Sequence, residues 1–450
     1  HLTGTLPQQY GSLNLKFLLL SSNYISGTIH STYGNMGYLQ NLYLDTNLLH
    51  GAIPSSIANI PYMQLLALEI NMLTGSVPAS ISTMPYLINL LLYQNHLTGS
   101  LDSVFNASEQ LELSTVVFNN NQFTGTIPEE LFWLKKLNSF SGVSNCFHGT
   151  FPANMCNAST LSSLALDGLS SASSCRNTLF PRLSSSYVVT RTVGTTIPEC
   201  LFHLPILTTL HLSGNGLTGT LPDTHVAPLL IDLVLSHNVL TGTIPLVYQR
   251  RQWYNLDLSY NRLTGDLSPD FESQTLNSTF YARLSHVIGL NITQNSSESS
   301  LSLENNRLSG QLPHSLQSKQ NVSVLGSNVF ACNLQESNLP VHDGGRANYQ
   351  CGSDSFNVPF YTWLVSMFVV LVVVWLVYRY RSAIDNCLGI SYATSNLEKW
   401  QSSLVVHATV LDPSHRLVAY QGVIELSVYI CTVAARCTLY MLLVLLPLYT

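Results

Sequence analysis

Leucine and isoleucine recur through most of the chain with a spacing that fits neither an amphipathic helix nor a long strand. In one such stretch the apolar positions are Leu39, Leu42, Leu44, Leu49 and Ile53. These positions do not fall on one helix face, but they suit a flat coil of chain whose apolar side chains all point inward. One coil alone cannot bury them. The pattern therefore predicts stacked coils that share a continuous core.

An asparagine marks every coil and makes the repeat visible. Asn23, Asn47, Asn71 and Asn95 follow one another at intervals of 24 residues. The same frame returns around Asn121, Asn145, Asn215, Asn238, Asn261 and Asn306. Where the chain turns away from a strand, backbone N–H and C=O groups would be buried unpaired, and an asparagine amide can both donate to and accept from them. We expect a ladder of asparagines along the stack.

The repeat resembles the extracellular, plant-type class of leucine-rich repeats. Its frame, L-x-x-L-x-L-x-x-N-x-L-T-G-x-I-P, is seen in "LLALEINMLTGSVP", "TLHLSGNGLTGTLP" and "SLSLENNRLSGQLP". The resemblance covers roughly residues 1–332. It implies an α/β-type repeat solenoid, a leucine-rich-repeat superhelix with a parallel β-sheet on its concave face, in which the T-G-x-I-P segments form a second, outer set of short strands. In each inner strand the alternation should bury Leu42 and Leu44 and expose Tyr43.

Within this solenoid, residues 1–331, two irregular islands break the frame at about residues 160–198 and 273–300. Between Pro152 and Pro198 there is length for two coils, with Leu169 and then Arg191 in place of the asparagine. Islands in related receptors carry ligand specificity; the alternative is degenerate coils under a glycan shield. The chain begins at His1 inside a repeat, so we expect a signal peptide and an amino-terminal cap to precede it.

Cysteine usage indicates an oxidising compartment. Six cysteines precede the longest apolar run, none in a close zinc-type pair: Cys146, Cys156, Cys175, Cys200, Cys332 and Cys351. The family resemblance implies that residues 332–357 form a carboxy-terminal cap and juxtamembrane segment, closed by a disulfide between Cys332 and Cys351. The other four cysteines allow three connectivities, among which we prefer Cys156 with Cys175.

The longest apolar run, residues 358–378, predicts a transmembrane helix. It holds 21 residues without a charge, enough to cross a hydrocarbon core of about 30 Å. Arg379 and Arg381 follow at once, which makes residues 379–422 a cytoplasmic segment and places the protein in the plasma membrane with the repeats outside. A buried core helix is the alternative, but no soluble domain remains to bury it. Residues 423–449 form a possible second transmembrane helix with Arg436 facing protein or water; a truncated tail is the alternative.

Glycosylation sequons support an extracellular repeat domain. Asn-x-Ser/Thr acceptors all precede the apolar run, at Asn106, Asn157, Asn277, Asn291, Asn295 and Asn321. Such acceptors are used on the surface of secreted proteins.

The low charge and the absence of catalytic motifs argue against nucleic-acid binding and against catalysis. Only 9% of residues are charged and the net charge is −6, so nucleic acid is not an expected partner. No phosphate loop, nucleophile elbow, zinc helix or kinase motif is present, and we expect no enzyme activity, no cofactor and no metal. His211 and His237 are expected at nearby strand positions in adjacent coils, as surface histidines rather than metal ligands, because a third ligand is not evident.

The concave face is then the expected binding surface for an extracellular protein, peptide or glycan. Tyrosines among neutral polar groups and carboxylates suit such a ligand. The candidate binding residues are Tyr43, Asp45, Glu69, Tyr93, Gln94, Asn119, His211, His237, Asp257, Tyr260 and Glu304. We expect a receptor-like recognition protein without a kinase domain that works with a signalling co-receptor. The alternatives are an adhesive surface antigen similar to those of protists, and the ectodomain of a larger receptor enzyme that continues beyond Thr450.

Overall fold

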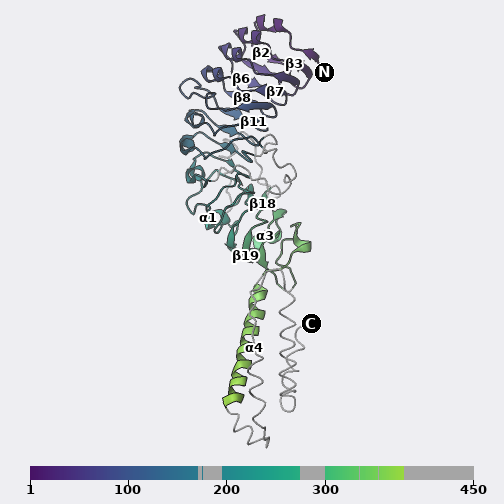
Figure 1. Ribbon diagram of the computed structural model, residues 1–450, viewed down its shortest axis with the longest axis vertical. Helices are drawn as coiled ribbons and strands as arrows, with labels where there is room; N and C mark the ends of the chain where they lie inside the picture. The colour runs from purple at the N-terminus through teal and green to yellow at the C-terminus, as the bar shows by residue number, and fades with distance from the viewer. Residues whose placement is uncertain (171–174, 176–194, 274–298, 334, 353, 380–450) are drawn as a thin grey trace, which may run out of the picture. The chain divides into compact units, whose positions relative to one another are not determined.

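The computed structural model describes residues 1–170, 175, 195–273, 299–333, 335–352 and 354–379. The chain divides into two compact units, His1–Leu364 and Val365–Thr450. The first unit is a solenoid of stacked coils (Figure 1). The predicted solenoid with a parallel sheet is confirmed.

Twelve short strands, one from each coil, form a parallel sheet along the solenoid. We call the solvent side of this sheet the concave face. Its strands are β2 (Phe17–Leu19), β4 (Asn41–Tyr43), β6 (Leu65–Ala67), β8 (Asn89–Leu91), β10 (Thr115–Val117), β12 (Ser139–Ser141), β13 (Ser163–Ala165), β14 (Thr209–His211), β15 (Asp232–Val234), β16 (Asn255–Asp257), β18 (Ser300–Ser302) and β20 (Asn321–Ser323).

The register of this sheet follows the leucine pattern. Leu42 pairs with Leu18 on one side and with Leu66 on the other, and all three side chains are buried. Leu44, just after β4, is also buried, whereas Tyr43 between them is only half-buried. Alternation along a strand places neighbouring side chains on opposite faces. The predicted inward leucines and outward tyrosine are confirmed.

A second set of parallel strands comes from the T-G-x-I-P segments, as expected for the plant-type repeat. They form a six-stranded and a three-stranded sheet. The strands are β1 (Thr3–Thr5), β3 (Tyr24–Gly27), β5 (Leu48–Gly51), β7 (Met72–Gly75), β9 (His96–Gly99), β11 (Gln122–Phe123), β17 (Thr264–Asp266), β19 (Arg307–Gln311) and β21 (Val329–Ala331). Between the two sheets, single bridges such as Thr220 with Thr241 continue the pairing.

Short helices close most coils. A proline stands immediately before nearly all of them, where its fixed φ and missing N–H are tolerated. They are η1 (Gln8–Ser12), η2 (Ser31–Asn35), η3 (Ser55–Asn59), η4 (Ala79–Thr83), η5 (Glu129–Trp133), η6 (Ala153–Asn157), η9 (Glu199–His203), α1 (Leu246–Gln249), α3 (His314–Gln317) and, in the cap, η10 (Arg346–Asn348).

The glycine of the T-G-x-I-P segment is required for two reasons. Gly242 has a φ of +81°, in the left-handed region that side chains rarely adopt. A Cβ at this position would also lie 2.9 Å from the Cγ2 methyl of Thr220 in the preceding coil. The threonine methyl therefore packs against the bare glycine of the next coil, which lets the outer strands approach closely.

The asparagine ladder is present. Asn95 donates from Nδ2 to the carbonyls of Leu68 and Leu92, at 3.0 and 3.2 Å, and its Oδ1 accepts from the backbone N–H of Leu73 at 2.9 Å. Each asparagine thus pairs backbone groups of its own coil and of the preceding one. The side chain is 5% exposed, so these bonds are made away from water.

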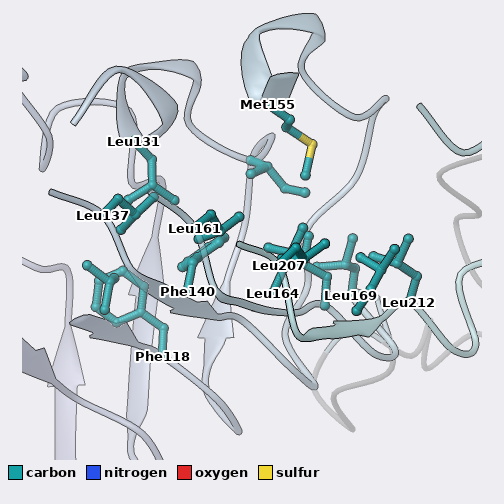
Figure 2. Packing of buried hydrophobic residues seen from close by; sticks show 14 of the residues in the cluster. Phe118, Leu131, Leu137, Phe140, Met155, Leu161, Leu164, Leu169, Leu207 and Leu212 are labelled. Atoms are coloured by element: carbon teal, nitrogen blue, oxygen red, sulfur yellow. The ribbon is translucent and has the colours of Figure 1, made fainter. Parts of the chain in front are cut away.

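One apolar core runs through the stacked coils. Figure 2 shows part of it, in which Leu164 of β13 belongs to the same cluster as Leu207 and Leu212 from the coil of β14. These side chains are fully buried. Because every coil contributes the same inward positions, burial of one coil depends on its neighbours.

The concave sheet continues across both irregular islands. β13 pairs directly with β14, and β16 pairs directly with β18. The length between Pro152 and Pro198 therefore adds one coil to this sheet and not the two that the sequence suggested, with Leu169 buried at the asparagine position. Residues 171–174, 176–194 and 274–298, which include Arg191, lie outside the described residues.

Three disulfides connect the cysteines of the solenoid and its cap. Cys146 is bonded to Cys175 and Cys156 to Cys200. The preference for Cys156 with Cys175 was wrong, because stacking brings Cys156, at the end of η6, against Cys200 in η9 of the next coil. Cys332 is bonded to Cys351.

The cap ends the core with polar groups. The carboxylate of Asp343 is buried and accepts from the backbone N–H groups of Val324 and Leu325, at 2.7 and 3.0 Å. The hydroxyl of Tyr349 donates to the carbonyl of Phe330 at 3.0 Å. These bonds satisfy backbone groups that no further coil is present to pair.

Helix α4 (Asp354–Arg379) is the last described element, and it covers the run predicted to cross the membrane. Residues 380–450, with the predicted cytoplasmic segment from residue 380 on and the possible second span, lie outside the described residues. Among the helices that the structure describes, none is both long enough and apolar enough to cross a bilayer.

Candidate ligand-binding face

The eleven candidate residues occupy three positions of the repeat, all on the side of the concave face. Tyr43, His211 and Asp257 are the last residues of their strands. Five others lie two residues after a strand: Asp45, Glu69, Tyr93, Asn119 and Glu304. Gln94, His237 and Tyr260 lie three residues after a strand, immediately before the ladder asparagine or its equivalent.

This third position has a left-handed backbone. Gln94, His237 and Tyr260 have φ values of 52°, 55° and 53°. Coil after coil repeats this conformation, even with the β-branched Ile70 at φ 53°, for which it is unfavourable. The turn directs these side chains outward, and all four are exposed. The sequence motif did not reveal this conformation, although glycine at the equivalent position 214, with φ 68°, was a signal for it.

The coils of β4, β6 and β8 carry a cluster of two carboxylates and a tyrosine, which are Asp45, Glu69 and Tyr93. Tyr43 pairs with Ala67 in the sheet, so Asp45 and Glu69 stand at equivalent positions on adjacent coils. Asp45 accepts from the hydroxyls of Ser21 and, at 3.3 Å, Thr46. Glu69 is different, because it is only 8% exposed and its Oε2 is buried without a hydrogen-bond partner.

Burial and charge shift the titration of this cluster. Burial, opposed by a hydrogen bond from its own backbone and reinforced by the charge of Asp45, raises the pKa of Glu69 to about 7. Burial, together with the charges of Glu69 and Asp45, also raises the pKa of the Tyr93 hydroxyl. Desolvation disfavours the charged form of an acid, so the charged form of Glu69 destabilises the folded protein.

A second cluster surrounds His211 in β14. Its Nε2 lies 2.8 Å from Oδ1 of Asp232, and its Nδ1 lies 3.8 Å from Oδ2 of Asp167. Burial by itself lowers the pKa of His211, but the hydrogen bond and charge of Asp232, with the charges of Asp167 and Asp257, outweigh it and raise the pKa. Asp232 also accepts from Nδ2 of Asn255 at 2.9 Å.

His211 and His237, which the sequence placed at nearby strand positions of adjacent coils, do not lie opposite each other in the sheet. The register places Val234, not His237, opposite His211. His237 instead stacks on the ring of Tyr260, with centroids 4.1 Å apart and planes 13° apart. The 23-residue coil between them puts these two exposed rings at the same position of adjacent coils.

Other candidates are engaged within the fold. Oδ1 of Asn119 accepts from the hydroxyl of Ser141 at 2.7 Å and from the backbone of Val143 at 2.9 Å. Glu304 accepts from the hydroxyl of Ser323 at 2.6 Å. These partners fix the side chains in place.

Two residues of the second cluster were missed by sequence reasoning. Asp232 is the first residue of its strand, and Asp167 lies two residues after β13, in a coil without its asparagine, where Oδ1 accepts from the backbone of Ser213 at 2.6 Å. The candidate list took residues between and just after the two strand leucines and did not include the irregular coil of Asp167. For Asp232 the polar residue before the first leucine, as in "LIDLVL", was the available signal.

The predicted glycosylation sites divide into described and undescribed ones. Asn157 and Asn321 are exposed, and Asn106 is half-buried, with its Oδ1 accepting from the hydroxyl of Ser108 at 2.6 Å. Asn277, Asn291 and Asn295 lie outside the described residues. Glycan attachment at any of them stays a prediction.

Comparison with known proteins agrees with the repeat frame. The family model described as Leucine Rich Repeat matches residues 14–36, 207–225, 253–274 and 299–318. These segments of the chain are leucine-rich repeats. Among curated proteins, none matches the chain.

Solved structures of plant receptor ectodomains share the fold of this leucine-rich-repeat protein. A TDR receptor is 25% identical with a TM-score of 0.57, covering 74% of this chain and 51% of its own. The PEPR1–AtPEP1 structure is 26% identical with a TM-score of 0.53, covering 73% and 44%. The ectodomain of the plant membrane receptor kinase GASSHO1/SCHENGEN3 from Arabidopsis thaliana, in complex with CASPARIAN STRIP INTEGRITY FACTOR 2, is 26% identical with a TM-score of 0.51, covering 74% and 41%. The chain spans about half the length of these receptor chains.

Proposed function

We propose that this leucine-rich-repeat protein is a cell-surface recognition protein that binds an extracellular peptide on its concave face. The observation that carries the proposal is the series of aromatic and acidic side chains on consecutive coils, from Tyr43 through Glu69 to Tyr93. Tyrosine supplies a large contact area with a polar tip, and such residues dominate the energy of protein interfaces. The similar ectodomain of GASSHO1/SCHENGEN3 is in complex with CASPARIAN STRIP INTEGRITY FACTOR 2, which supports ligand binding by a repeat domain of this kind.

The test compares the two sides of the same coils. The full chain is screened against peptide and glycan arrays, and the strongest binder is titrated against two variants. Tyr43→Ala with Tyr93→Ala alters the concave face. Tyr62→Ala with Tyr86→Ala is the matched control, since these tyrosines are 50% and 49% exposed before the strands of the same region.

We expect one saturable peptide whose affinity falls at least tenfold in the concave-face variant and less than twofold in the control. Truncation of an interface tyrosine costs more than about 1 kcal/mol where it is an energetic centre. Broad, weak binding to many array members, or equal loss in both variants, would overturn the proposal and favour an adhesive surface protein.

We further propose that residues 358–378 anchor the protein in the plasma membrane, with a signalling co-receptor as partner. The support for the anchor is the uncharged run of 21 residues followed by Arg379 and Arg381. Among the side chains described in this run, Trp363, Phe368 and Trp375 are exposed.

Topology is tested on intact cells. Peptide N-glycosidase added outside should lower the mass of the protein, and the shift should shrink in Asn157→Gln, whose acceptor is exposed. Alkaline carbonate extraction should leave the chain in the membrane pellet. An unchanged mass together with release into the supernatant would contradict a membrane-anchored protein with extracellular repeats.

A further inference from the structure

The carboxylate of Glu69 lacks what a buried charge needs. Its Oε2 is shielded from solvent and accepts no hydrogen bond. Buried charges in proteins are ordinarily paired or hydrogen-bonded, because an unpaired one costs several kcal/mol. Among the ion pairs of the described residues, none involves Glu69 or Asp45. No described cationic side chain therefore neutralises the charge of these two carboxylates.

The residues next to Glu69 increase the cost of its unpaired charge. Asp45 stands at the same position of the preceding coil and Tyr93 at that of the following coil, and strands of one sheet lie about 4.8 Å apart. The two carboxylates therefore repel each other across one strand spacing. The ring of Tyr93 borders them from the other side.

The chemistry of a complementary group follows from these three side chains. It must carry positive charge, supply N–H donors to carboxylate oxygens and tolerate an aromatic ring, which describes guanidinium and alkylammonium groups. A metal ion is less suitable, because among the described residues no cluster of three histidine, cysteine or acidic side chains is placed to hold one.

We propose that Asp45, Glu69 and Tyr93 form a binding site for a guanidinium or ammonium group of the ligand, that is, for an arginine, a lysine or a free amino terminus. This inference rests on the proposed function and specifies the ligand class for the same face. Because Oε2 is covered in the free chain, neighbouring side chains shift as the cation enters, as interface side chains commonly do.

A small cation tests the site without the natural ligand. Butylguanidinium and butylammonium chlorides are titrated into the full chain by isothermal calorimetry at pH 8, with butanol as the uncharged probe. We expect saturable binding of both cations and none of butanol. Glu69→Gln keeps the shape of the side chain and should weaken binding at least tenfold, and Asp45→Asn should weaken it severalfold.

The control is Glu130→Gln. Glu130 is an exposed glutamate of η5 and is not among the candidate residues of the concave face, so its loss should leave cation affinity unchanged. Equal affinity in wild type and Glu69→Gln, or an equal loss in Glu130→Gln, would overturn the site. A melting curve for each variant separates loss of the site from loss of the fold.

The pH dependence of cation affinity is a second test of the site. The site binds through charged Glu69, whose pKa lies near 7 and is influenced by Asp45 and Tyr93. Lowering the pH from 8 to 5.5 should therefore weaken cation binding in wild type, by at least tenfold, and far less in Glu69→Gln. Constant affinity across this range would contradict a role for Glu69.

These outcomes are distinguishable from those of the proposed function. Suppose that an array peptide without a basic group binds the concave face, and that its affinity is the same for wild type and Glu69→Gln. The proposed cation site is then wrong, and the recognition function stands. If no peptide binds but butylguanidinium binds through Glu69, the site stands and the recognition function is wrong.

Discussion

At the scale of single residues, the concave face keeps polar groups that the fold does not need. Glu69 is buried among Asp45 and Tyr93 with an oxygen left unpartnered, whereas its counterpart Glu304 has a serine partner. Destabilising groups of this kind concentrate at functional sites, where stability is given up for activity. The contrast between two glutamates at one repeat position is what singles out the first.

Replacing Glu69 by glutamine should stabilise the free protein. The folded pKa of about 7 lies above the ordinary value near 4.5, so the charged form is disfavoured in the fold and the cost is full above pH 7. It vanishes as the pH falls through 7 toward 4.5. At pH 8 we expect Glu69→Gln to raise the free energy of unfolding by about 1–3 kcal/mol, with little gain at pH 4.5, measured by denaturant titration. A loss of stability at pH 8 would contradict an uncompensated charge.

His211 should show the opposite pH dependence. Its raised pKa means that the fold favours the protonated form, so its contribution is fully present below its ordinary pKa of about 6.5 and is lost as the pH rises through the folded value. We expect His211→Asn to cost about 1 kcal/mol more at pH 5.5 than at pH 9. Urea midpoints of both proteins at the two pH values measure this difference, and an equal cost at both would exclude the Asp232 ion pair as its source.

At the scale of the coil, one short turn is repeated with different residues. The position before the ladder asparagine is left-handed with serine, threonine, isoleucine, glutamine, histidine or tyrosine, although that region disfavours most of them. The asparagine that follows offsets this strain, because its side chain donates hydrogen bonds to carbonyl groups of two coils. The packing of the coil therefore fixes the conformation of this turn, and the side chain before the ladder asparagine can differ from coil to coil on the concave face.

Asn95→Ala should show what one ladder asparagine contributes. The change leaves the buried N–H of Leu73 without its partner, and the carbonyls of Leu68 and Leu92 keep only the hydrogen bonds from Asn71 and Asn121. An unpaired buried group costs about 1–3 kcal/mol, so we expect a loss of this size in thermal or urea unfolding. His96→Ala, the next residue and exposed, is the control and should change stability by less than about 0.5 kcal/mol. Equal effects would mean that water replaces the ladder bonds.

At the scale of the whole solenoid, coils stabilise only their neighbours, and covalent bonds reinforce the stack where the repeat is weakest. The Cys146–Cys175 and Cys156–Cys200 disulfides enclose the irregular island and connect residues 29 and 44 positions apart. The Cys332–Cys351 disulfide spans 19 positions in the cap. In a nearest-neighbour stack, an island or an open end is where unfolding starts, so these are the places where cross-links help most.

Disulfide mapping checks the arrangement of the island. Non-reducing proteolysis with mass spectrometry should recover Cys146 linked to Cys175 and Cys156 linked to Cys200. Removing the second pair as Cys156→Ser with Cys200→Ser should cost about 2–4 kcal/mol, because a long loop of the unfolded chain is no longer constrained. Recovery of Cys156 linked to Cys175 would mean that the coils of η6 and η9 do not stack as described.

The repeat itself determined the fold. Leucines and asparagines at a regular period can be buried together only by stacking coils, so the inner strand positions and the ladder followed from spacing, and the outer strands from the resemblance to plant-type repeats. Side-chain partners did not follow, because they lie one coil apart, at 19 to 49 residues along the chain, and depend on how many residues the islands add. Only the tertiary structure decided that Cys156 meets Cys200, that Asp167 and Asp232 flank His211, and that Oε2 of Glu69 is buried without a hydrogen-bond partner. Periodicity is a local property of the chain, whereas burial and pairing of charges depend on which coils become neighbours.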